Sequence, residues 1–196
     1  MTSRRPRAYL AGPEVFLVDK AEVFAGKSAL CERYGIEAAP PMDATAHKPD
    51  VRLSRQIYLR NVQLVEAADL IIANVSPFRG PSADVGTVFE LGYGFANGLP
   101  VFGYSNDPRN FLERVEAFVG PSVSGQGGLK YGRDGYAIED FDLADNLMIH
   151  EMLEGFGGIF RPSGSEARKL SDLSQFERCL DHAAAFMARR AGHGPT

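Results

Sequence analysis

One stretch, from Asp69 to Tyr104, constrains the fold more than any other part of the chain. It begins with the apolar run Leu70–Ala73, which is typical of a strand buried on both faces. A loop rich in proline, glycine and serine follows, after which apolar residues recur at helical spacing until Gly98. Pro100–Tyr104 then begins a second buried strand. A strand, a helix and a second strand in this order predict a right-handed βαβ crossover.

The other segments extend this unit into a single α/β domain over residues 1–196. Arg7–Ala11, Ile36–Ala38 and Gly158–Phe160 are predicted to be further strands. Helices are predicted at 16–34, 51–67, 108–119, 144–153 and 173–189, the first with Val15, Val23, Ala29 and Leu30 on its inner face. Gly120–Asp134 has no periodicity, which predicts a mobile surface loop. Together, these predicted strands and helices indicate a three-layer α/β sandwich with a five-stranded parallel sheet in flavodoxin-like order. Residues 1–6 and 191–196 are predicted to be disordered tails.

Composition narrows the class of partner. The net charge of −4 argues against nucleic acid or an anionic membrane surface as the main partner. No apolar run approaches the roughly 20 residues that a membrane span needs. Cys31 and Cys179 lie in helical patterns without metal-ligand spacing, so we interpret them as buried thiols of a cytoplasmic protein. The four histidines are scattered, and nothing in the sequence indicates a metal or another cofactor.

Two carboxylates lie where such a sheet binds its ligands. Asp84 and Glu90 follow the strand at 70–73, and ligand crevices of open parallel sheets lie at the carboxyl ends of the strands. Six residues apart on one helix, they would point about 120° apart, so both border one crevice only if Asp84 belongs to the loop. The alternative is that Asp84 caps the helix and Glu90 is solvated. Against solvation, Glu90 lies between Phe89 and Leu91, with glycines at positions 86, 92 and 94 around it.

Three polar residues elsewhere admit two interpretations each. Tyr9 falls inside a buried strand, so its hydroxyl needs either a structural carbonyl or a catalytic carboxylate. Asn61 shares the apolar stripe of its helix and is either a structural bridge or a ligand contact. Asp43 reads as a loop residue or a cap, with a site role as the other possibility. From these residues alone, carboxylate chemistry in a crevice is indicated, such as attack on an anomeric carbon.

Four motifs, in this order along the chain, resemble the nucleoside 2-deoxyribosyltransferase family. They are Y-L-A-G-P-E-V-F at 9–16, R-N-V-Q-L-V-E-A-A-D-L-I-I-A-N-V-S-P-F-R-G at 60–80, D-V-G-T-V-F-E-L-G at 84–92 and N-L-M at 146–148. Together they extend over most of residues 8–150.

The resemblance implies roles for the polar residues. Glu90 would be the nucleophile that attacks C1′ of a 2′-deoxynucleoside and forms a covalent deoxyribosyl-glutamate, as in retaining N-glycosyl transfer. Tyr9 would hold the Glu90 carboxylate, and Asp84 would bind the sugar hydroxyls or help to protonate the departing base. Asn61 stands where some members carry aspartate, which leaves the identity of the general acid open.

The resemblance also implies the substrates and the assembly. Gly12, Glu14, Phe16 and Gly86 are expected at the substrate, with Glu14 and Phe16 near the base. Asn146 and Met148 would reach the site of a neighbouring subunit, which implies a homo-oligomer. The partners would be a 2′-deoxynucleoside and a free nucleobase, in nucleotide salvage.

Two other functions stay open. Related proteins hydrolyse the N-glycosidic bond of 2′-deoxynucleosides or of their 5′-monophosphates. A non-catalytic nucleoside-binding module could be built on the same fold.

Overall fold

A five-stranded parallel sheet forms the centre of the computed structural model, which describes residues 4–41 and 50–192. Its strands lie in the order β2 (Glu37–Ala39), β1 (Arg7–Ala11), β3 (Leu70–Asn74), β4 (Val101–Tyr104) and β8 (Ile159–Phe160). Every neighbouring pair is parallel. This arrangement confirms the predicted α/β fold with a parallel sheet in flavodoxin-like order.

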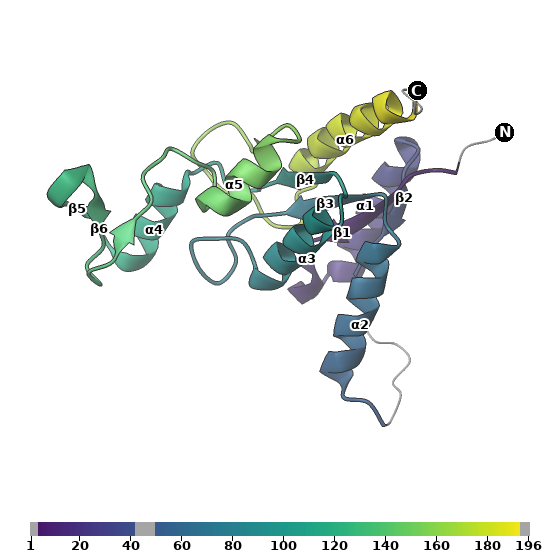
Figure 1. Cartoon of the computed structure of the whole chain (residues 1–196), viewed down its shortest axis with the longest axis horizontal. Coiled ribbons are helices and arrows are strands. Elements are labelled where there is room, and N and C mark those ends of the chain that lie inside the picture. The colour runs from purple at the N-terminus through teal and green to yellow at the C-terminus, as the bar shows by residue number, and fades with distance from the viewer. Residues whose placement is uncertain (1–3, 42–49, 193–196) are drawn as a thin grey trace.

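Helices cover both faces of the sheet (Figure 1). One face packs against α2 (Leu53–Glu66), α3 (Val85–Ala96) and α5 (Leu147–Glu154), and the other against α1 (Lys20–Arg33) and α6 (Ser174–Gly192). Alternation along the strands divides the core accordingly. Tyr9 and Ile71 lie in the cluster with α2 and α3, whereas Leu10 and Ile72 lie in the cluster with α6.

The start of the first predicted helix was wrong, whereas its inner face was right for Val23, which is buried, and for Leu30, which packs against the core. Pro13–Phe16 forms a separate 3₁₀ turn, η1, and Leu17 is extended, so that α1 begins only at Lys20. Four consecutive apolar residues from Val15 to Val18 cannot share one helix face, and Val18 is fully exposed. The buried positions of α1 are Val23, Lys27 and Cys31, while Ala29 is exposed.

The segment predicted as an aperiodic loop at 120–134 was also wrong in part. It contributes β5 (Val123–Ser124) and β6 (Lys130–Tyr131) to a small antiparallel sheet with β7 (Ala137–Ile138), and the turn η2 (Gln126–Gly128) lies between the first two. Strands of two residues are too short to show an alternation in sequence. This sheet lies beyond α4 (Phe111–Val119), away from the central sheet (Figure 1).

Some predictions concern the ends of the described ranges. Asp43 and the outermost parts of the predicted tails, residues 1–3 and 193–196, lie outside the described residues. Of the remainder, Arg4 forms an ion pair with Asp69 at 2.8 Å, and α6 continues to Gly192. Cys31 and Cys179 are buried free thiols.

Candidate active site

The carboxylate of Glu90 is held by side chains from two other elements. The Tyr9 hydroxyl of β1 donates a hydrogen bond of 2.6 Å to Oε1 of Glu90. The Asn61 amide of α2 donates a second bond to the same oxygen at 3.3 Å. No hydrogen bond from the described residues reaches Oε2. One oxygen is therefore fixed, and the other is left for a ligand.

The positions of these three residues follow from the local structure. Tyr9 lies in the strand and is fully buried, on the face covered by α2 and α3. Glu90 lies in the second turn of α3, which packs against α2 and β3. The strand alternation and the facing helices thus bring together residues that are 81 and 29 positions apart in sequence.

Burial changes the acid–base behaviour of the pair. The pKa of Glu90 is raised from its ordinary value of 4.5 to about 7, mainly by desolvation and to a smaller extent by the negative charge of Asp84. The hydrogen bonds from Tyr9 and Asn61 lower the pKa and offset part of this rise. Burial and the neighbouring Glu90 carboxylate raise the pKa of Tyr9 well above its ordinary range, so Tyr9 remains a hydrogen-bond donor.

Asp84 serves as the N-cap of α3. Its Oδ2 accepts hydrogen bonds from the backbone N–H and the hydroxyl of Thr87, at 3.0 and 3.3 Å. The capping interpretation is therefore correct for Asp84, while the solvated interpretation is wrong for Glu90. Capping leaves Asp84 close enough for its charge to raise the pKa of Glu90.

A pocket of about 150 Å³ opens onto Glu90 between α2 and α3. It is lined by Asn61 and Gly86, both expected at the substrate, and by residues that sequence reasoning missed: Tyr58, Val62, Val65, Phe89 and Tyr93. Helical spacing gave a signal for two of these, because Tyr58 lies one turn before Asn61 and Tyr93 lies one turn after Phe89. Aromatic side chains of this kind offer surfaces against which a planar ring can stack.

The glycines around Glu90 have different roles. A Cβ on Gly94 would lie 2.2 Å from Cδ1 of Ile71, so this glycine permits close packing of α3 on the sheet. A Cβ on Gly86 would lie 3.0 Å from Oδ2 of Asp84. Gly92 has open space around it. Close packing on the sheet thus explains Gly94 but not Gly92.

Asn61 has a second polar atom without a partner. Its Oδ1 is buried and accepts no hydrogen bond from the described residues. The amide orientation follows from chemistry, because the opposite orientation would place Oδ1 against the Glu90 carboxylate. Asn61 therefore offers an acceptor, but no acidic proton, to the surroundings of Glu90.

Glu14 and Phe16, the residues expected near the base, do not line the pocket at Glu90. Glu14 is fully buried, and its Oε1 accepts hydrogen bonds from Lys27, Asn74 and Tyr104 at 2.5, 2.9 and 2.8 Å. The Glu14 carboxylate is therefore part of the buried interior. It lies beside Gly12, because a Cβ atom added to Gly12 would be 2.1 Å from Oε2 of Glu14.

Phe16, by contrast, is 54% exposed and is stacked on Phe78 with a centroid distance of 5.0 Å. The guanidinium of Arg79 lies over both rings.

Asn146 and Met148 lie at the start of α5. Asn146 caps this helix, and its Oδ1 accepts from the N–H of Met148 at 3.1 Å. Met148 is 72% exposed. Neither residue lines the pocket at Glu90 within the described chain.

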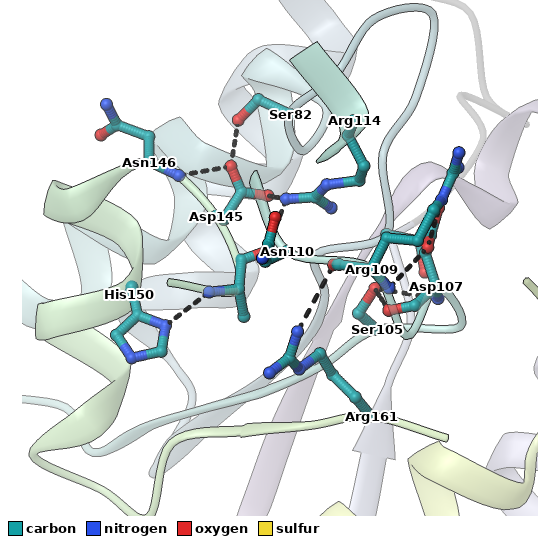
Figure 2. A network of polar contacts seen from close by, with 12 residues as sticks. Ser82, Ser105, Asp107, Arg109, Asn110, Arg114, Asp145, Asn146, His150 and Arg161 are labelled. Carbon is teal, nitrogen blue, oxygen red and sulfur yellow. Dashed lines mark hydrogen bonds and ion pairs between the residues drawn. The ribbon is translucent and has the colours of Figure 1, made fainter. Parts of the chain in front are cut away.

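A buried polar network holds this helix start in place (Figure 2). Asp145 accepts hydrogen bonds from the Ser82 hydroxyl at 2.5 Å and from the N–H of Asn146 at 2.8 Å, and it pairs with Arg114 at 3.3 Å. Ser82 lies two residues before Asp84. The network therefore links the loop that leads to Asp84 with α4 and with the Asn146 cap.

The described ranges contain no group of three or more His, Cys, Asp or Glu side chains that could hold a metal ion. They also contain no helix long and apolar enough to cross a membrane.

Known proteins match this chain across the elements that form the site. The family model described as nucleoside 2-deoxyribosyltransferase matches residues 8–148. An uncharacterized protein of Schizosaccharomyces pombe is 31% identical over 171 residues, covering 81% of this chain and 79% of the relative. The solved structure of a 2-deoxyribosyltransferase from Leishmania mexicana is 28% identical with a TM-score of 0.60, covering 90% of this chain and 98% of that one.

Proposed function

Because the chain belongs to the nucleoside 2-deoxyribosyltransferase family, we propose that it transfers 2-deoxyribose between nucleobases through a covalent ester on Glu90. Family and fold support an enzyme that acts on nucleosides, as a deoxyribosyl transferase or as an N-glycosidase. The observation that carries the proposal is the Glu90 carboxylate, whose Oε1 is fixed by Tyr9 and Asn61 while Oε2 has no such partner. The proposed role is in nucleotide salvage in the cytoplasm.

The proposed reaction has two displacements at one carbon. In the first, Oε2 of Glu90 attacks C1′ of the 2′-deoxynucleoside, and the N-glycosidic bond breaks with its electron pair leaving on the base. In the second, a ring nitrogen of another free base attacks C1′, and the ester bond to Glu90 breaks to restore the carboxylate. Tyr9 and Asn61 keep the attacking group in place in both steps.

Protonation of the departing base is the step that the residues constrain least. Asn61 has no acidic proton, so in this proposal Asp84 or water supplies the proton. In this proposal Asp84 also binds the sugar hydroxyls. Proposed contacts to the substrate further include Gly86, which lines the pocket, and the exposed ring of Phe16.

A product assay tests the proposal. The protein is incubated with deoxyinosine, with and without free adenine, and the products are separated by chromatography. Deoxyadenosine formed only in the presence of adenine is the expected result. Hypoxanthine and free deoxyribose at the same rate in both mixtures would instead identify an N-glycosidase.

A variant separates catalysis from binding. Replacing Glu90 by Ala is expected to reduce turnover by several orders of magnitude, since the reacting group is removed. Nucleoside binding by the variant, measured by calorimetry, is expected to persist. A variant with unchanged turnover would contradict the covalent mechanism, and no turnover of deoxynucleosides or their 5′-monophosphates by the unaltered protein would favour a binding module.

The proposal includes a homo-oligomer in which Asn146 and Met148 reach the site of a neighbouring subunit. What supports this is exposure. Met148 is 72% exposed, and two aromatic residues that line the pocket at Glu90, Tyr58 and Phe89, are 46% and 50% exposed. A second subunit placed against these residues would cover them and close the pocket.

A further inference from the structure

A second depression, of about 640 Å³, lies at the β8 edge of the sheet, and it shares no lining residue with the pocket at Glu90. Its walls include Pro108 and residues from β8, the segment after it, and α6: Phe160, Arg161, Ser163, Gly164 and Arg178. All of these except Pro108 lie outside residues 8–148, which the family model matches. The depression is therefore a feature of this chain beyond its catalytic region.

Arg161 is fixed by neutral groups. Its Nη1 donates to the backbone carbonyl of Pro108 at 3.0 Å and to that of Arg109 at 3.4 Å. Figure 2 shows Arg161 pointing toward Arg109. The side chain is half-buried. Carbonyl acceptors orient the guanidinium without neutralising its charge, and its other N–H groups have no hydrogen bonds within the described chain.

Arg178 converges on the same place from α6. Its Nη1 donates to the carbonyl of Arg161 at 3.0 Å and to Oε1 of Gln175 at 2.8 Å. Its guanidinium lies 5.9 Å from the ring centroid of Phe160. The second cation is thus also oriented by neutral acceptors and by an aromatic ring.

Neither guanidinium has an acidic partner. Across residues 4–41 and 50–192, no ion pair joins Arg161 or Arg178 to a carboxylate, although ten other pairs occur. The acidic residues next to the lining positions in sequence are paired elsewhere: Asp107 with Arg109 and Glu177 with Arg33. Two oriented, uncompensated positive charges therefore face one depression of a protein whose net charge is −4.

We propose that the depression at Arg161 and Arg178 binds the phosphate group of a small anionic ligand. The guanidinium fork matches phosphate oxygens, and arginine holds its charge at every physiological pH. The Ser163 hydroxyl adds a neutral donor on the same wall. The volume lies within the range of ordinary ligand pockets, about 300–1,000 Å³, so it accommodates a phosphate and the group that carries it.

Binding to the full-length protein tests this proposal. Inorganic phosphate and a nucleoside 5′-monophosphate are titrated at constant ionic strength by calorimetry. The same titrations are made on Arg178→Gln and on a control, Arg5→Gln, which removes the same charge from an exposed arginine that pairs with Glu32 at 3.9 Å. Melting temperatures without ligand establish that each variant is folded.

The expected result is saturable binding that weakens about tenfold or more in Arg178→Gln and is unchanged in Arg5→Gln, since charge-assisted hydrogen bonds are lost only in the first. Tighter binding of the 5′-monophosphate than of inorganic phosphate would identify a phosphorylated nucleoside as the ligand, and equal binding would identify free phosphate.

Three results would overturn the proposal. These are no saturable binding to the unaltered protein, equal weakening in both variants, and displacement of phosphate by an unphosphorylated deoxynucleoside, which would place the anion in the pocket at Glu90. None of these results depends on whether Glu90 forms an ester, so failure here is distinct from failure of the proposed function.

Discussion

At the scale of single residues, the site depends on the hydrogen bonds that hold the Glu90 carboxylate and on how its surroundings change its pKa. Glu90 has a pKa of about 7, raised by burial and lowered in part by the Tyr9 hydrogen bond. A nucleophilic carboxylate must be ionised, so the fraction of active enzyme changes near neutral pH. Two predictions follow from the direction of these shifts.

The first concerns the pH dependence of activity. We expect kcat/KM to rise with pH along a limb whose midpoint lies near pH 7, as Glu90 loses its proton. Tyr9→Phe removes a hydrogen bond that favours the ionised form, so the limb moves to higher pH. Tyr34→Phe is the matched control, because the Tyr34 hydroxyl donates to Glu177 at 3.5 Å instead and lies outside the pocket at Glu90. An identical limb in all three proteins would refute this account of the Tyr9 bond.

The second concerns stability and is independent of the reaction. The unfolded chain has the ordinary Glu pKa of 4.5, whereas the folded protein has about 7, so between these values the folded state binds more protons. Its free energy of unfolding therefore falls as pH rises through this window. Glu90→Gln does not titrate, so its melting temperature relative to the unaltered protein should increase from pH 4.5 to pH 7 and then level off. A constant difference would show that the pKa is not raised.

At the scale of elements, α3 carries the site because it packs closely on the sheet. Gly94→Ala would place a methyl group 2.2 Å from Cδ1 of the fully buried Ile71. We expect a loss of about 1–3 kcal/mol in the free energy of unfolding from this overpacking. Gly92→Ala, in open space on the same helix, should instead stabilise the protein by about 0.5–1 kcal/mol. Denaturant titrations measure both changes, and equal effects would contradict the assigned packing.

The elements also show how far the sequence could be interpreted. The sheet and its helices could be predicted because their segments show clear patterns. A strand buried on both faces, such as β3, is a continuous apolar run, and a helix such as α3 shows helical spacing with a clear end signal. The start of α1 could not be predicted, because it depends on the extended conformation of Leu17. The strands β5 to β7 could not be predicted either, because each is only two residues long. The family resemblance, built on four motifs, is confirmed by the match over residues 8–148.

The site itself could be predicted only in part. Tyr9, Asn61 and Glu90 were named from their residue types and from the motifs, and the structure brings them within hydrogen-bond distance. The buried ion pair between Glu14 and Lys27 was not predicted, because an ion pair between a 3₁₀ turn and a helix leaves no periodic signal in the sequence. The roles of Asp84, Asn146 and Met148 in the reaction stay predictions.

At the scale of the whole molecule, the proposed assembly can be tested by mixing defects. Glu90→Gln and Asn146→Ala should each have little activity alone if Asn146 acts in the neighbouring site. Co-expression with distinguishable tags should restore one intact site in each mixed dimer, that is about half of the native sites in the tandem-purified mixed oligomer. Tandem purification and the transfer assay measure this. No recovery in a verified mixed oligomer would place Asn146 outside the neighbour's site.

The hydrogen bond between Tyr9 and Glu90 joins positions 81 residues apart, and Tyr9 is at the same time a fully buried part of the core. During synthesis on the ribosome, the first strand must therefore wait until α2, β3 and α3 have emerged before its hydroxyl meets its partner. Closing a loop of this length costs conformational entropy that only the paired sheet offsets. The Glu90 carboxylate, the proposed nucleophile, consequently acquires its held geometry only once β1 and α3 are both in place.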